Sequence, residues 1–133
     1  MPAELIRSSS LPDRAQYAYA AAAPPGTRLV FLAGSCPLDA AGNTVGAGDY
    51  RRQAEQCVAN LRTALAEASA DIPDLVNTRV LVATTRQADL VAAWEVIRDA
   101  LAPHDPPSTL MGVTVLGYDD QLVELEAIAA VSA

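Results

Sequence analysis

The segment "LVELEAIAAV", residues 122–131, constrains the fold of this chain more than any other stretch. Its length and apolar content are typical of a β-strand, in which successive side chains point to opposite faces. One face then carries Glu124 and Glu126 between Leu122 and Ile128. This pattern favours carboxylates that face a partly apolar site. An edge strand with its carboxylates in solvent stays open as the plainer interpretation.

The other apolar runs predict further strands, and two segments with helical spacing predict helices. The expected strands cover residues 4–7, 17–23, 28–36, 76–83, 109–116 and 122–131, and the expected helices cover residues 50–69 and 89–101. By composition alone, residues 17–23 ("YAYAAAA") also fit a helix. The order β-β-β-α-β-α-β-β predicts a single α+β domain over residues 1–133, with a mixed six-stranded sheet and two helices on one face.

The predicted sheet has one face that the helices cannot cover. Asp49 is placed to cap the first helix, whose apolar residues repeat along one side. Residues 28–36 and 76–83 are apolar at both odd and even positions, which indicates burial on both faces of the sheet. We therefore expect the uncovered face to meet another subunit.

The charge composition disfavours or excludes several kinds of site. The chain carries a net charge of −7, and all nine of its basic residues are arginine. An acidic surface repels nucleic-acid phosphates, and a chain without lysine cannot form a Schiff base on a lysine side chain. One His and two Cys do not supply the usual zinc ligand sets, so we expect no metal and treat Cys36 and Cys57 as free thiols.

The sequence does not suggest a membrane protein. No apolar run is long enough to span a bilayer. The N-terminal segment "MPAELIRSSSLPDR" lacks the basic and apolar regions of a signal peptide. A cytoplasmic location is the resulting expectation.

Five stretches resemble the YjgF/RidA family in their order and spacing. They read "QYAYAAAA", "RLVFLAGSCPLD", "AEQCVANLRTALAEA", "DLVNTRVLVAT" and "STLMGVTVLGYDDQLVELEAIA". The motif "FLAGSCPLD" is similar to the family's V-S-G-Q-x-P-x-D, and "LVELEAIA" is similar to its x-x-E-I-E-A-I-A. These proteins are the reactive-intermediate deaminases, also labelled endoribonuclease L-PSP. The resemblance covers nearly the whole chain.

The resemblance implies a chorismate-mutase-like fold that assembles as a homotrimer. Ligand clefts between the subunits would take a small-molecule substrate. Deaminases of the family hydrolyse enamine and imine intermediates such as 2-aminoacrylate, and they need no metal or organic cofactor. An arginine clamps the substrate carboxylate, and a glutamate handles the attacking water.

The resemblance assigns roles to individual residues. Glu124 matches the water-handling, catalytic glutamate, and Glu126 matches a second, less central one. Tyr17 matches a tyrosine that borders the cleft, and Gly34 matches a glycine whose backbone approaches the ligand. Ser35 stands where the family usually has glutamine.

The arginine clamp is missing from this chain. Where the deaminases read A-R-S-T, this sequence reads "PPST", so Pro107 occupies the arginine position and Thr109 lies close to it. Proline supplies neither charge nor a donor. A branch of the family that lacks the arginine is the resulting interpretation, and 2-aminoacrylate is not its expected substrate.

Two functions remain open from the sequence. One is a cofactor-independent enzyme that processes a small enamine or imine, with Glu124 as the proton-handling group and a substrate that carries no carboxylate. The alternative is a non-catalytic trimer that binds a metabolite or a protein partner in the same cleft. A ribonuclease is disfavoured, because the acidic chain has no basic stripe.

Overall fold

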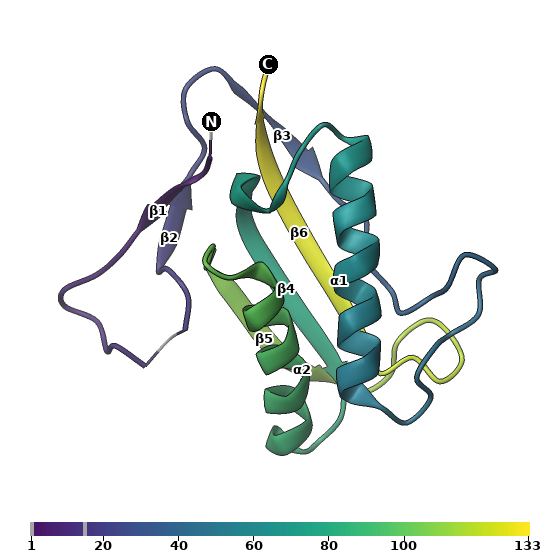
Figure 1. Ribbon diagram of the computed structural model, residues 1–133. Helices are drawn as coiled ribbons and strands as arrows, with labels where there is room; N and C mark the ends of the chain where they lie inside the picture. The colour runs from purple at the N-terminus through teal and green to yellow at the C-terminus, as the bar shows by residue number, and fades with distance from the viewer. Residues whose placement is uncertain (1, 15) are drawn as a thin grey trace.

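The computed structural model describes residues 2–14 and 16–133 of the chain. Within these ranges the helices and strands follow one another as shown in Figure 1. They are β1 (Glu4–Ile6), β2 (Ala20–Ala22), β3 (Thr27–Phe31), α1 (Tyr50–Glu67), the 3-10 turn η1 (Ile72–Asp74), β4 (Leu75–Ala83), α2 (Gln87–Leu101), β5 (Ser108–Val113) and β6 (Val123–Ser132). The expected α+β class with two helices is confirmed. The ambiguous segment 17–23 contains a strand, β2.

The strands form two sheets instead of the single six-stranded sheet that the sequence predicted. Four strands pair in the order β3-β6-β4-β5, with β4 and β5 parallel and the other pairs antiparallel. Among the described residues, strands β1 and β2 pair only with each other, in an arm that stands beside the main sheet (Figure 1). Pro24 and Pro25 lie in the segment that follows β2, and proline has no N–H to donate to a strand ladder. The prediction of one six-stranded sheet was therefore wrong.

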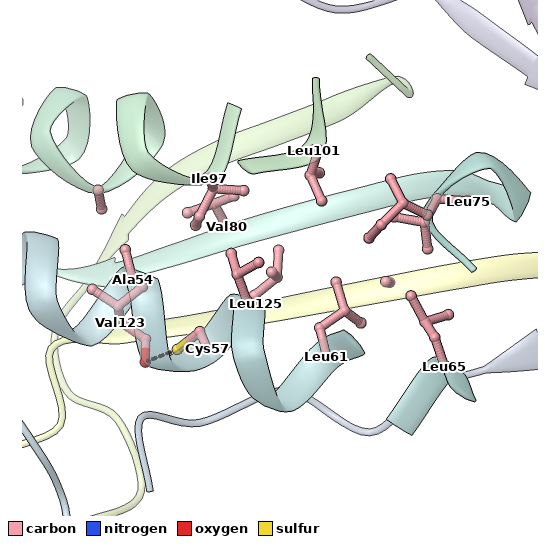
Figure 2. Packing of buried hydrophobic residues seen from close by; sticks show 14 of the residues in the cluster. Ala54, Cys57, Leu61, Leu65, Leu75, Val80, Ile97, Leu101, Val123 and Leu125 are labelled. Atoms are coloured by element: carbon pink, nitrogen blue, oxygen red, sulfur yellow. Dashed lines mark hydrogen bonds between the residues drawn. The ribbon is translucent and has the colours of Figure 1, made fainter. Parts of the chain in front are cut away.

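Both helices lie over one face of the four-stranded sheet, and the core fills the space between them (Figures 1 and 2). The buried core residues are Ala54, Cys57, Val58, Leu61 and Leu65 of α1, Ile72 of η1, Ala93, Ile97 and Leu101 of α2, Leu75, Val80 and Val82 of β4, and Val123, Leu125, Ala127 and Ala129 of β6. Burying one Leu, Ile or Val side chain contributes about 1.5–3 kcal/mol to stability. Strand β6 thus has one wholly apolar face, as its alternation requires.

Two polar residues fix the start of α1. Asp49 caps the helix as expected, and its carboxylate accepts a hydrogen bond from the backbone N–H of Arg52 at 3.0 Å. Gln53 is fully buried, which its polarity did not suggest. Its carboxamide accepts from the N–H of Leu122 at 2.7 Å and donates to the carbonyl of Asp120 at 2.8 Å. Gln53 therefore anchors the turn that leads into β6.

The face of the sheet opposite the helices is open in the single chain. Its β3 residues Leu29 and Phe31 are 51% and 71% exposed. The accessible surface of 7238 Å² exceeds the ~6,700 Å² typical of a compact monomer of this mass. An exposed apolar sheet face marks an interaction surface.

Candidate functional site

Glu124 lies on the open face of a central strand. On one side of β6, Glu124 pairs with Leu81 of β4. On the other side of β6, the next residue, Leu125, pairs with Ser35 in an isolated bridge. The interpretation of this segment as an edge strand is therefore wrong. The Glu124 side chain is half-buried, between β4 and the chain that continues from β3.

Gly34 makes room for the Glu124 carboxylate. A Cβ atom built on Gly34 would lie 2.2 Å from Oε2 of Glu124 and 2.8 Å from its Cδ. The glycine is required here by close approach, since any larger side chain meets the carboxylate. The family resemblance placed these two residues in one site, and the structure places them in contact distance of each other.

Two neutral donors approach the other carboxylate oxygen, Oε1. The Cys36 thiol lies 3.3 Å from it, and the carboxamide nitrogen of Gln121 lies 3.2 Å from it. Burial, together with the hydrogen bond and charge of Glu124, raises the pKa of Cys36 to about 11. The thiol is therefore protonated at neutral pH and donates to the carboxylate.

Ser35 does not offer its side chain to a ligand. Its hydroxyl donates to the carbonyl of Cys57 on α1 at 2.6 Å. Its backbone N–H and carbonyl both pair with Leu125, at 2.7 and 2.9 Å. The expected substrate-binding residue thus joins the segment after β3 to α1 and β6, and it shapes the site through the backbone.

The remaining predicted residues lie apart from Glu124 in the single chain. Thr109 is on β5, where it pairs with Arg79 of β4. The carbonyl of Pro107 accepts from the N–H of Thr78 at 3.1 Å and so fixes the start of β5. Tyr17 packs edge-on against Trp94, with ring centroids 5.6 Å apart. Within one chain, the predicted site residues Tyr17, Pro107 and Thr109 therefore lie apart from Gly34 and Glu124.

Tyr17 lines a separate cavity of about 220 Å³. Trp94 and Arg98 of α2 and Gln16 form part of its wall. The carboxamide oxygen of Gln16 accepts from both Trp94 Nε1 and Arg98 at 2.8 Å. In the described part of the chain, Tyr17 thus packs against Trp94 and lines this cavity, away from Glu124.

The second carboxylate of β6 has a cation beside it. Glu126 lies 3.6 Å from a guanidinium nitrogen of Arg79 on β4, and both side chains are partly exposed. A pair of this kind contributes about 0–1 kcal/mol. Among the described salt bridges none involves Glu124, so the two glutamates differ in their electrostatic surroundings.

A shallow cleft of about 270 Å³ adjoins Gly34 and Cys36. Its described lining is uncharged: Ala33, Gly34, Ser35, Cys36, Leu38, Asn60, Leu61, Ala64 and Tyr118. Asn60 donates to the carbonyls of Cys36 and Leu38 at 2.8 and 2.9 Å, which holds the loop against α1. An uncharged cleft beside one carboxylate suits a small ligand that carries no negative charge.

Two further features bear on the class of protein. Within residues 2–14 and 16–133, no three His, Cys, Asp or Glu side chains gather closely enough to hold a metal ion. In the same ranges, no helix has the length and apolarity needed to cross a membrane.

Comparison with known proteins decides the family. The profile described as Endoribonuclease L-PSP matches residues 9–131. The chain belongs to this family. A RutC family protein of Pyrococcus abyssi is 29% identical over 101 residues, covering 76% of this chain and 77% of that protein. The match confirms the resemblance to YjgF/RidA proteins that the motifs suggested.

Solved structures of L-PSP family proteins share the fold. YyfB of Yersinia pestis, a protein of unknown function in the conserved Rid family, superposes with a TM-score of 0.89 at 28% identity, over 98% of this chain and all of that one. A YjgF/YER057c/UK114 family member from Mycobacterium tuberculosis gives 0.66 at 27% identity, over 97% and 99% of the two chains. The α+β arrangement is thus that of the family.

Sequence reasoning missed three residues of the site in this L-PSP family chain. Cys36 lies two positions after Gly34, so the alternation of an extended chain places both on one face. That signal was available. The roles of Gln121 and Asn60 depend on a turn and a helix that meet only in the folded chain.

The close approach of Gly34 and Glu124 predicts a coupling between them. Gly34→Ala should lower the free energy of unfolding by about 1–2 kcal/mol, because the carboxylate must leave its bonds with Cys36 and Gln121. In a Glu124→Ala background the same change should cost less than about 0.5 kcal/mol. Urea denaturation of the four proteins measures both costs.

Gly117→Ala is the control, because a Cβ there meets no atom within 4 Å. It should leave the stability within about 0.5 kcal/mol of the parent. Equal costs of Gly34→Ala in the two backgrounds would show that Glu124 is not what crowds this glycine.

Proposed function

We propose that this protein hydrolyses a small imine-type or enamine-type reactive intermediate in the cytoplasm, without a cofactor. The observation that carries the proposal is the Glu124 carboxylate, in which Oε1 accepts hydrogen bonds from Cys36 and Gln121 while Oε2 lies against the backbone of Gly34. Membership of the L-PSP family supports the same class of chemistry. The acidic charge of −7 argues against RNA as the substrate.

The proposed reaction needs one group that moves a proton. Water adds to the imine carbon while Oε2 of Glu124 accepts a proton from it. Glu124 then gives that proton to the nitrogen, which leaves a carbinolamine with a hydroxyl and an amino group on one carbon. The carboxylate next takes the hydroxyl proton and passes it to the amino nitrogen as the carbon–nitrogen bond breaks, so that a carbonyl compound and ammonia leave. General acid–base catalysis of this kind contributes about 10²–10⁴-fold to the rate.

The substrate is proposed to lack a carboxylate. Pro107 stands at the position of the family's arginine, and its only polar atom, the carbonyl, is bonded to the N–H of Thr78 and the side chain of Asn77. A charge-assisted pair of this type is worth about 2–5 kcal/mol when it is desolvated. A carboxylate would lose that anchor and would also approach Glu124, which repels it.

The proposed active unit is a homotrimer. The open sheet face with Leu29 and Phe31 has the exposure and apolarity of a subunit interface. In one chain, Glu124 is separated by β4 from Thr109 on β5. A cleft between two copies would bring Thr109 and Pro107 of one subunit toward Glu124 of the next.

The trimer proposal predicts the effect of a charge on the open face. Phe31→Asp should dissociate the assembly into monomers of 13.9 kDa, because each Phe side chain buried at an interface contributes about 1.5–3 kcal/mol. Light scattering during gel filtration measures the mass. Val91→Asp, at a half-exposed apolar position on α2, is the matched control and should remain trimeric. A monomeric parent protein would contradict the proposal.

The enzymatic proposal predicts a loss of turnover in Glu124→Gln. Against a panel of imines generated in situ, kcat/KM should fall at least about 10²-fold, because the amide cannot accept a proton. Release of ammonia or of the carbonyl product measures the rate. Glu126→Gln, two positions along the same face, should stay within about threefold of the parent, since Glu126 is paired with Arg79.

The outcomes separate the candidate functions. Equal turnover by the Glu124→Gln and parent proteins would remove Glu124 from the mechanism. A metabolite held in the cleft, with no imine of the panel turned over, would favour the non-catalytic binding module.

A further inference from the structure

We infer that Cys36 and Gln121 are positioning residues that hold Oε1 of Glu124 and thereby leave Oε2 as the oxygen that exchanges protons. The consequence for catalysis rests on the proposed imine hydrolysis. The geometry of the three side chains does not depend on that reaction. The hydrogen-bonded arrangement and the proposed hydrolysis can therefore be refuted separately.

Gln121 is fixed in one orientation. The residue is 4% exposed, and its carboxamide oxygen accepts from the N–H of Tyr118 at 3.1 Å. Its nitrogen donates to the carbonyl of Val123 at 3.1 Å and to Oε1 of Glu124 at 3.2 Å. A flipped amide would face an N–H with its own N–H, so the hydrogen bonds specify that the nitrogen faces the carboxylate.

The backbone on both sides of Gln121 is also anchored. The buried carboxamide of Gln53 bonds to the carbonyl of Asp120 and to the N–H of Leu122. The donor to Glu124 is therefore carried by a turn that is tied to helix α1. A residue held in this way can fix another side chain at little entropic cost, because its own freedom has already been lost.

Cys36 supplies the second donor to the same oxygen. Its sulfur lies 3.3 Å from Oε1 of Glu124 and 3.6 Å from the carbonyl of Gly34. The single S–H proton goes to the carboxylate, since an ionised acceptor forms the stronger bond. A thiol is a weak donor, so it holds the oxygen without neutralising the carboxylate.

The two oxygens of Glu124 are consequently unequal. Oε1 accepts two hydrogen bonds, whereas Oε2 accepts none from the described residues and lies against Gly34, where a Cβ would stand 2.2 Å from it. A base is most effective when one lone pair is free and its direction is fixed. Cys36 and Gln121 thus act on the reaction through Glu124 and need not touch the substrate.

Thiol alkylation tests this arrangement without any substrate. The titratable groups that face Cys36 are Glu124 on β6 and Cys57 on α1, and burial keeps the pKa of Cys57 far above its usual range. In the native protein, iodoacetamide should modify Cys36 slowly below pH 10. In Glu124→Gln the modification at pH 9 should be at least about tenfold faster, because a fall of one unit in pKa raises the thiolate fraction tenfold.

Two controls accompany the alkylation. Cys36→Ala should remove the modification, which assigns it to Cys36, and Glu126→Gln should leave the rate unchanged. Identical rates in Glu124→Gln and the parent at every pH would overturn the inference, since the thiol would then not be bonded to Glu124.

Catalytic measurements test the positioning role with an imine that the protein turns over. Cys36→Ala and Gln121→Leu should each lower kcat at least about tenfold with KM unchanged. Cys36→Ser keeps an O–H donor and should restore kcat to within about threefold of the parent.

The results distinguish this inference from the proposed function. Turnover that depends on Glu124 but is the same in the Cys36→Ala, Cys36→Ser and parent proteins would overturn the positioning role and leave the imine hydrolysis intact. No turnover of any imine, with alkylation accelerated by Glu124→Gln, would sustain the hydrogen-bonded arrangement and reject the enzyme.

Discussion

The strict alternation of β6 in the middle of the sheet is the constraint on which the rest of the structure depends. With β3 on one side and β4 on the other, the strand cannot slip by one residue without moving its apolar residues out of the core. Val123 and Leu125 are fully buried beneath the helices, so Glu124 must lie on the opposite face. Burial of the core residues of β6 is thus sufficient to place the Glu124 carboxylate on the open face of the sheet.

The two glutamates of β6 have separate surroundings although they share a face. Glu126 is paired with Arg79, whereas Glu124 is surrounded by a glycine, a thiol and a carboxamide. Neutral donors hold a carboxylate in place without pairing it with a positive charge, as Arg79 does for Glu126. This difference is the reason that we assign proton handling to Glu124 and a structural role to Glu126.

The fold class could be predicted from the sequence because periodicity and capping signals act locally. The Asp49 cap and the helix that follows it are examples. The pairing of β1 with β2 apart from the main sheet could not be predicted, since composition does not say which strands meet. The roles of Gln53 and Gln121 could not be predicted for a similar reason. A buried carboxamide is recognised only when its hydrogen-bond partners in the folded chain are known. Gly34 and Glu124 were found through the family motifs, and the structure adds the contact between them.

The central claim is that this site keeps the glutamate of its family but accepts a substrate without a carboxylate. The most direct test compares kcat/KM for two imines of equal size, one made from a 2-oxo acid and the other from the corresponding uncharged ketone. The account predicts that the uncharged imine is hydrolysed at least about tenfold more efficiently, because Pro107 offers no cation and Glu124 repels a carboxylate. A preference for the 2-oxo acid imine would contradict the account and would show that a cation in the site binds the carboxylate.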